Sequence, residues 1–346
     1  MSTATNSRFH ELLEARGVLV ADGAMGTSLF ALGMESGACP EFLNVDDPEM
    51  IRTVHRQFVE AGSDIILTNT FGGNRRRLML HKATDRVAEL NKAGVTIARE
   101  VADNADRPVL VAGSVGPTGD LFEPLGPLTH AEGVEVFSEQ IEAMVEAGAD
   151  LAWAETLSSV EEISAAYEAA AKFDLPLVVT MSFDTHGKTM MGFKPSELGR
   201  WADENHAPLA AVGANCGIGP GDVVAAVHEL ADACHRPVVA KANCGIPVYE
   251  DGQLTYPSDP DEMTHYVDLA LRSGAKIIGA CCGSTGEHLG LIRQHVDAFL
   301  ADTAPAERPE VTEIHARLGN TATGSAGSTD AADAAPKRRG RRRRAS

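Results

Sequence analysis

Eight short apolar segments recur along the chain, and each is followed by a stretch with the hydrophobic periodicity of a helix. The segments cover residues 17–23, 64–71, 108–117, 150–156, 176–184, 209–217, 237–244 and 276–283. Apolar strands that alternate with helices are typical of a parallel sheet covered by helices. Eight such units predict an α/β fold closed into a (β/α)8 TIM barrel, although an open sheet of eight strands would give the same pattern.

The apolar periodicity bounds the predicted barrel. We expect a single domain at residues 9–302, preceded by a short leader at residues 1–8. Residues 303–346 are rich in Ala, Thr, Gly and Arg, and we predict that they form a disordered basic tail.

Charge and apolar content limit the classes of partner. The net charge of the 346-residue chain is −19, and residues 337–344 hold seven of its positive charges, so the remainder is even more acidic. An acidic body argues against nucleic-acid binding by the barrel, and the role of the tail stays open. The sequence contains no apolar run long enough for a membrane span and no secretory leader, so we expect a cytoplasmic protein.

Three of the six cysteines stand at the carboxyl ends of predicted strands. Cys216 ends the sixth segment, and Cys281 and Cys282 end the eighth. Catalytic groups of a barrel come from these strand ends and the loops after them. Three thiolates that leave a fourth position open are typical of a catalytic Zn²⁺ site. Each cysteine alone could instead be a buried apolar residue, and the adjacent pair could form a labile disulfide.

The predicted donor set indicates a reaction class. Zinc held by three thiolates is a poor activator of water, but it can keep a substrate thiol deprotonated. We therefore expect alkylation of a thiol.

Several motifs together resemble the homocysteine S-methyltransferase family. They are DGAMGT (22–27), LTNTFGGNR (67–75), SVGPTG (114–119), ET (155–156), MSFD (181–184), GANCG (213–217) and GACCG (279–283). The resemblance extends over residues 9–300 and implies that Cys216, Cys281 and Cys282 bind Zn²⁺, with homocysteine sulfur in the open position. It further implies that Asp22 and Glu155 hold the amino-acid part of homocysteine, and that attack of the thiolate on a methyl donor yields methionine.

The methyl donor is open at this point. Betaine users in the family hold the donor in an aromatic cage, and the segment NTFGGN (69–74) has two glycines after Phe71 where animal betaine enzymes have a tyrosine. The residues of the TNTF and DGAMGT motifs resemble the methionine synthase module more closely. The resemblance thus implies betaine, or methylcobalamin carried by a separate corrinoid protein, with S-methylmethionine or another thiol substrate as alternatives.

Asn215 and Asn243 precede cysteines at two strand ends, and we predict that they bind the carboxylate of the substrate or orient the ligands, although each could also cap a helix. Cys244 is expected to be a spectator, with a role as fourth ligand the alternative. Two other classes of protein remain conceivable. A zinc-binding regulatory protein would not need Asp22 and Glu155, and a redox protein would be expected to carry a C-x-x-C motif.

Overall fold

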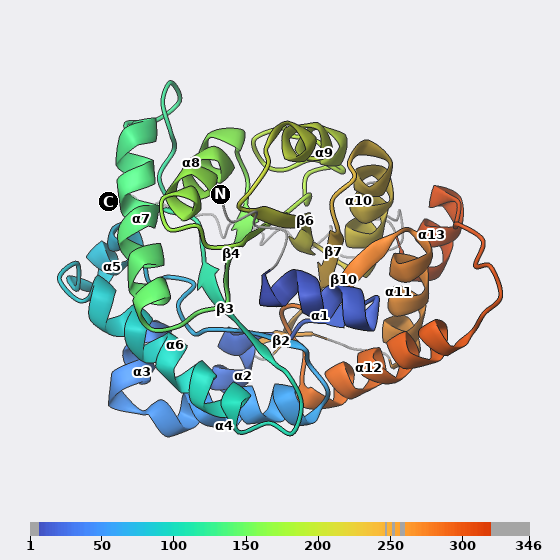
Figure 1. The fold of residues 1–346 in the computed structure, drawn as a ribbon, viewed down its shortest axis with the longest axis horizontal. Helices are drawn as coiled ribbons and strands as arrows, with labels where there is room; N and C mark the ends of the chain where they lie inside the picture. Colours follow the sequence, from blue (N-terminus) through green and yellow to red (C-terminus); the bar gives the residue numbers. More distant parts are fainter. Residues whose placement is uncertain (1–6, 246–247, 251–252, 257–259, 320–346) are drawn as a thin grey trace, which may run out of the picture.

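The computed structural model describes residues 7–319 apart from 246–247, 251–252 and 257–259, and it confirms the barrel. Eight parallel strands form one sheet in the order β1-β10-β7-β6-β5-β4-β3-β2. A parallel bridge between Ala21 and Ile65 joins the two ends of that order and closes the sheet. Figure 1 shows the strands in the middle of the molecule with the helices around them. The strands are β1 (Leu19–Val20), β2 (Ile65–Leu67), β3 (Leu110–Val115), β4 (Leu151–Leu157), β5 (Leu177–Met181), β6 (Leu209–Cys216), β7 (Val238–Ala242) and β10 (Ala275–Ala280).

A ring of helices surrounds the strands. Two of the long helices have typical N-cap residues. Asp47 accepts a hydrogen bond from the Met50 N–H, and Thr129 forms a capping box with Glu132. The ring consists of α4 (Pro48–Glu60), α6 (Val87–Asp103), α7 (His130–Glu146), α8 (Val160–Ala171), α9 (Pro195–Glu204), α10 (Pro220–Ala233), α11 (Pro260–Arg272) and α12 (Gly286–Ala301). Shorter elements follow the first two strands: α2 (Met25–Ala31), η2 (Pro40–Phe42), α3 (Leu43–Asp46), α5 (Arg75–Leu78) and η3 (Met79–His81).

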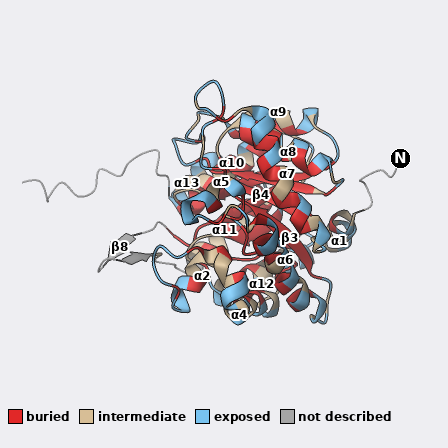
Figure 2. Cartoon of the chain, turned by 90° about the vertical axis from the view of Figure 1, so that its left-hand side faces the viewer, coloured by how far each residue is buried: buried red, intermediate tan, exposed pale blue. Residues whose placement is uncertain are grey.

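The core is divided by the sheet into an outer layer and a filled lumen, and Figure 2 shows the buried residues concentrated around the strands. Outward-facing strand residues pack against the helices, whereas a separate cluster fills the lumen. Trp153 is the largest lumen side chain, and its Nε1 donates to Thr180 Oγ1 at 3.1 Å. The lumen is therefore a packed core rather than a channel.

Helix α1 (Arg8–Arg16) covers the amino-terminal end of the barrel, where it lies across the strands in Figure 1. Phe9 is fully buried among lumen residues such as Leu19 and Ile65. The predicted boundary between leader and barrel at residue 9 therefore falls inside a helix. Residues 1–6 of the predicted leader lie outside the described residues.

The prediction of disorder from residue 303 onward is wrong for its first part. Residues Val311–Leu318 form α13, which packs against α10 and α11. Its Ile314 is fully buried, and Arg272 of α11 bonds Glu313 at 2.9 Å and the Glu307 carbonyl at 2.7 Å. Two apolar residues one turn apart and a buried arginine stem are enough to dock a short helix. The rest of the predicted tail, residues 320–346, lies outside the described part of the chain.

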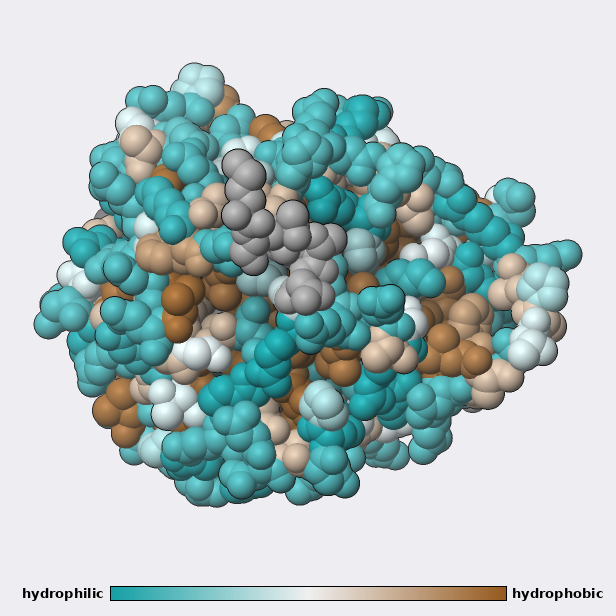
Figure 3. All heavy atoms as spheres, viewed as in Figure 1, coloured by the Kyte–Doolittle hydropathy of each residue, from teal (hydrophilic) through white to brown (hydrophobic). Residues whose placement is uncertain are grey.

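An antiparallel hairpin, β8 (Val248–Glu250) with β9 (Gln253–Thr255), follows β7 and was not predicted. Within the described residues no helix is both long enough and apolar enough to cross a membrane. Hydrophilic residues cover most of the face drawn in Figure 3.

His55 on α4 is a buried titratable group within the outer core. It has no solvent exposure, and neither ring nitrogen has a hydrogen-bond partner among the described residues. Burial lowers the pKa of His55 from 6.5 to about 4.

We predict that His55 makes the fold sensitive to mild acid. Between pH 6.5 and about 4 the unfolded imidazole binds a proton and the folded one does not. The stability contribution of the neutral imidazole is therefore complete above pH 6.5 and is lost as the pH falls. The loss amounts to about 3 kcal/mol of unfolding free energy. Urea unfolding across this range should show a smaller loss for His55→Leu than for the wild type, whereas His206→Gln, which removes an exposed imidazole, should follow the wild type. Equal acid sensitivity of His55→Leu and wild type would contradict the assignment.

Candidate functional site

Three thiols converge at the carboxyl-terminal end of the barrel. Cys216 is the last residue of β6, and Cys281 and Cys282 directly follow β10. Because β7 pairs with both strands, residues distant in sequence meet across a single intervening strand. Their sulfur atoms all lie within 4.8 Å of one another, and all three residues are partly exposed.

The backbone at these positions explains how adjacent cysteines can face the same point. Regular strand β10 ends at Ala280, so the alternation that would separate Cys281 from Cys282 has already stopped. Gly283 follows with φ of 82°, and Cys216 itself has φ of 60°. A left-handed conformation at a residue other than glycine is uncommon and concentrates at functional sites.

The thiols strongly affect one another's protonation. Hydrogen bonds from Cys216 and Cys281 lower the pKa of Cys282, whereas hydrogen bonding with Cys281 and Cys282 raises the pKa of Cys216. The arrangement accommodates one thiolate readily, but a second and third negative charge at this spacing need a cation. Such a donor set suits a soft metal ion.

Asn243 ties together the loops that carry the three thiols. Its Oδ1 accepts the Cys282 N–H at 3.0 Å, and its Nδ2 donates to the Gly217 carbonyl at 2.8 Å. Asn215 is held in a similar way, since its side chain bonds both the backbone N–H and the hydroxyl of Thr156. Thr156 has φ of 62°, an uncommon conformation for a β-branched residue, and Asn215 supports it. Of the roles predicted for the two asparagines, these contacts favour orienting the site.

The loop after β1 is joined to the loop after β10. Ser284 Oγ accepts the Ala24 N–H at 2.9 Å, and Thr27 Oγ1 accepts the Gly283 N–H at 3.3 Å. Gly23 is required here, because a Cβ atom would lie 2.4 Å from Ser284 Oγ and 2.8 Å from the Phe58 ring. The motifs DGAMGT and GACCGS are thus one structural unit.

Two buried carboxylates lie at the same end of the barrel. Asp22 is 2% exposed and its Oδ2 accepts the Leu67 N–H at 2.7 Å, while Glu155 is 8% exposed and accepts the Ser114 hydroxyl at 2.7 Å. Burial raises the pKa of both carboxyl groups, to about 7 for Asp22, against the opposing effect of Lys241. Glu155 lies on β4 and Asp22 just after β1, with β2 and β3 between them in the closed sheet.

Lys241 is a residue that the sequence interpretation missed. It lies on β7, is 2% exposed, and places Nζ 3.4 Å from Asp22 Oδ1. Burial alone would lower the pKa of Lys241, but the negative charges of Asp22, Glu155 and Cys281 together raise it. The signal was a single cation inside the apolar run VVAKAN, which periodicity alone does not interpret.

Cys244 does not belong to the cluster of the three thiols. It is fully buried, and its backbone N–H donates to the Cys282 carbonyl at 3.0 Å. Its sulfur is outside the group of metal-competent atoms found among the described residues.

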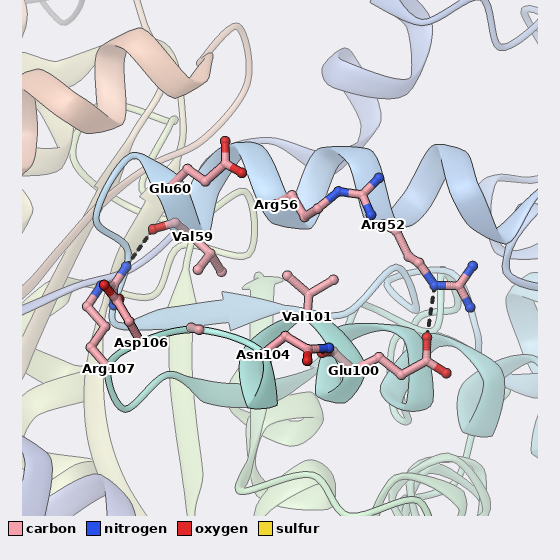
Figure 4. A pocket seen from close by; sticks show the side chains of 10 residues that line it. Arg52, Arg56, Val59, Glu60, Glu100, Val101, Asn104, Asp106 and Arg107 are labelled. Atoms are coloured by element: carbon pink, nitrogen blue, oxygen red, sulfur yellow. Dashed lines mark hydrogen bonds and ion pairs between the residues drawn. The ribbon is translucent and has the colours of Figure 1, made fainter.

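A surface groove between α4 and α6 lies away from this site (Figure 4). It is lined by Arg52, Arg56, Glu60, Glu100, Asn104 and Arg107, with an Arg52–Glu100 ion pair of 2.8 Å along one side. Both helices end there, at the amino-terminal end of the strands. That end of a barrel is generally the stabilising rather than the catalytic one.

The fold and the site define a class of protein: a (β/α)8 barrel with three thiols and two buried carboxylates at its catalytic end. A family model described as homocysteine S-methyltransferase matches residues 19–296. The chain therefore belongs to the homocysteine S-methyltransferase family.

Individual relatives agree with this membership. The chain is 31% identical to methionine synthase of Mycobacterium leprae over 340 residues, which is 90% of this chain and 27% of that protein. Methionine synthase of Mycobacterium tuberculosis is also 31% identical, over 87% of this chain and 26% of its own length. The chain thus spans about a quarter of these curated relatives. The metallated form of the homocysteine methyltransferase MmuM from Escherichia coli superposes with a TM-score of 0.68 at 25% identity, and the match covers 83% of this chain and 99% of that one.

Removing the Asn243 side chain should destabilise the carboxyl-terminal end of the barrel. In Asn243→Ala the partly buried Cys282 N–H and Gly217 carbonyl lose their partners, so we expect a loss of about 1–3 kcal/mol of unfolding free energy. Denaturant unfolding of the metal-free protein measures it. Asn104→Ala, which removes one exposed hydrogen bond on α6, is the control and should change stability by less than about 0.5 kcal/mol. A neutral Asn243→Ala would refute the bridging role.

Proposed function

We propose that the protein is a zinc-dependent homocysteine S-methyltransferase that makes methionine. The observation that carries the proposal is the convergence of the Cys216, Cys281 and Cys282 sulfur atoms within 4.8 Å of one another. Ligands of a tetrahedral zinc with Zn–S bonds of about 2.3 Å lie about 3.8 Å apart, which is compatible with this cluster. The family membership and the name of the MmuM relative support the same reaction.

The three cysteines would hold the zinc ion and leave one position for the substrate. When bound, zinc supplies a Lewis acid that keeps the substrate sulfur deprotonated at neutral pH. No protein side chain then has to remove a proton during methyl transfer. Asn243 holds the loops of the cysteines in place, as orienting contacts do in metal sites generally.

The two carboxylates would bind the ammonium group of homocysteine. Glu155 is the more available of the two, since Ser114 engages only its Oε1, while Asp22 is already bonded by Leu67 and paired with Lys241. Fixing the amino-acid end holds the sulfur in one place relative to the donor, and such positioning lowers the barrier. A purely regulatory zinc protein would have no use for buried carboxylates beside the thiols.

For the methyl donor we propose methylcobalamin delivered by a separate corrinoid protein. The loops after β1, β3 and β5 expose large apolar side chains, as expected of a surface that another protein contacts: Phe30, Leu32, Leu121, Leu125 and Met190. A cage for betaine would need aromatic faces at the mouth. Both tryptophans are engaged elsewhere, Trp153 in the lumen and Trp201 against Tyr167. Tyr256, whose side chain lies against Gly283 and interacts with Cys282, supplies one ring and not a cage.

The metal assignment makes a direct prediction. Cys216→Ala should lose both stoichiometric zinc and methionine formation, because two thiols alone do not complete the donor set. The matched control is Cys244→Ala, which removes a buried thiol outside the cluster and should retain zinc and activity. Zinc content by elemental analysis, together with methionine formation from homocysteine, measures both. Undiminished activity in zinc-free protein would refute the proposal.

The donor assignment is tested by offering three donors in parallel to zinc-loaded protein and homocysteine. We expect turnover with methylcobalamin, fastest when a corrinoid protein carries it, and little with betaine or S-methylmethionine. Efficient turnover with betaine alone would identify the protein as a betaine user and overturn the assignment. Leu125→Asp, which places a charge among the exposed apolar side chains of these loops, should slow only the reaction in which a corrinoid protein carries the methyl group.

A further inference from the structure

Lys241 is a buried cation that the proposed chemistry does not yet use. The ammonium group lies in the barrel, where an unpaired charge would be strongly disfavoured. Gly279 on the neighbouring strand leaves space for the lysine side chain, because it has no Cβ atom. A Cβ at this position would lie 3.2 Å from Lys241 Cγ and 3.0 Å from Ala21 Cβ. An apolar residue would fill such a position without needing a counter-charge, so the lysine requires an explanation.

The contacts of Lys241 leave most of its hydrogen-bonding capacity unused. An ammonium group has three N–H donors. Within the described residues, its short polar contact is the ion pair of 3.4 Å with Asp22 Oδ1, an oxygen that lacks a well-formed hydrogen bond. Asp22 Oδ2 is already taken by the Leu67 N–H. At least two donors of Lys241 are therefore available to something that enters the mouth.

The charges around the site fit a zwitterion. Asp22 pairs with Lys241 at 3.4 Å, and the charges of Glu155 and the Cys281 thiol also act on the lysine, so carboxylates, a thiol and a cation lie together at this end of the barrel. An amino-acid thiol carries an ammonium group for Glu155, a sulfur for the cysteines, and a carboxylate that needs a cation. Asn215 and Asn243 are held by the protein itself on both the oxygen and the nitrogen of their side chains.

We propose that Lys241 is a specificity-determining residue that binds the α-carboxylate of the substrate, so that the site selects an amino-acid thiol over a simple one. This inference rests on the proposed function and assigns the one end of homocysteine that Asp22, Glu155 and the cysteines do not bind. The alternative is that Lys241 only neutralises Asp22 for the sake of the fold. The two roles differ in their effect on binding: only the first makes the affinity for a thiol depend on the thiol's carboxylate.

The experiment compares three thiols on the full-length, zinc-loaded protein by titration calorimetry. Homocysteine carries both charged groups, 3-aminopropane-1-thiol lacks the carboxylate, and 4-sulfanylbutanoic acid lacks the ammonium group. The wild type should bind homocysteine about 10- to 100-fold more tightly than the aminothiol, the value of one charge-assisted hydrogen bond. Lys241→Met should reduce this ratio to near one while the aminothiol binds as well as before or better, because the site has become more negative.

Two further variants complete the test. Lys276→Met removes an exposed lysine of β10 and should keep all wild-type affinities. Lys241→Gln retains a neutral donor and should give an intermediate ratio, which provides a second reading if Lys241→Met folds poorly. A ratio unchanged in both Lys241 variants, or equal weakening of all three thiols, would overturn the carboxylate role. If wild-type protein binds no thiol at all, the proposed function itself fails.

Discussion

The seam between β1 and β2 is the constraint on which the site depends, because it closes the barrel and sets where the strand ends meet. Its backbone contribution is small, a parallel bridge between Ala21 and Ile65. Two buried carboxylates reinforce it from opposite sides. Asp64 at the start of β2 accepts the Val20 N–H at 2.9 Å, and Asp22 after β1 accepts the Leu67 N–H at 2.7 Å.

The two ends of the seam are neutralised differently. Around Asp64 stand three arginines, with Arg293 at 3.1 Å, Arg16 at 3.3 Å and Arg107 at 3.8 Å. These belong to the amino-terminal end, where stability is the main requirement. Asp22 has a single lysine, and that lysine lies in the region where we place the substrate. The same kind of carboxylate contact thus serves the fold at one end and the fold together with the candidate site at the other.

The sequence predicted the repetitive parts of this structure well. All eight strands of the barrel and the long helices follow from apolar periodicity, and the barrel register suggested that thiols from β6 and β10 could meet. What it missed depends on individual contacts. A lone lysine in an apolar strand has no periodicity to interpret, and the surroundings that accommodate it depend on Gly279 and Asp22, which are distant from it in the sequence. Helix α13 was missed because two apolar residues within a low-complexity stretch do not by themselves predict a helix. The contacts with Arg272 and α10 that hold this helix are visible only in the structure.

The double engagement of Asp22 has a consequence for mutational studies of this family member. An exchange at Asp22 opens a hydrogen bond of the barrel closure and at the same time leaves Lys241 buried without its counter-ion. A loss of activity there would therefore report on folding and on chemistry together. Glu155 accepts a hydrogen bond from the Ser114 hydroxyl, and its carboxylate takes no part in closing the sheet. Of the two carboxylates, Glu155 is the one at which a loss of the proposed substrate binding can be separated from damage to the scaffold.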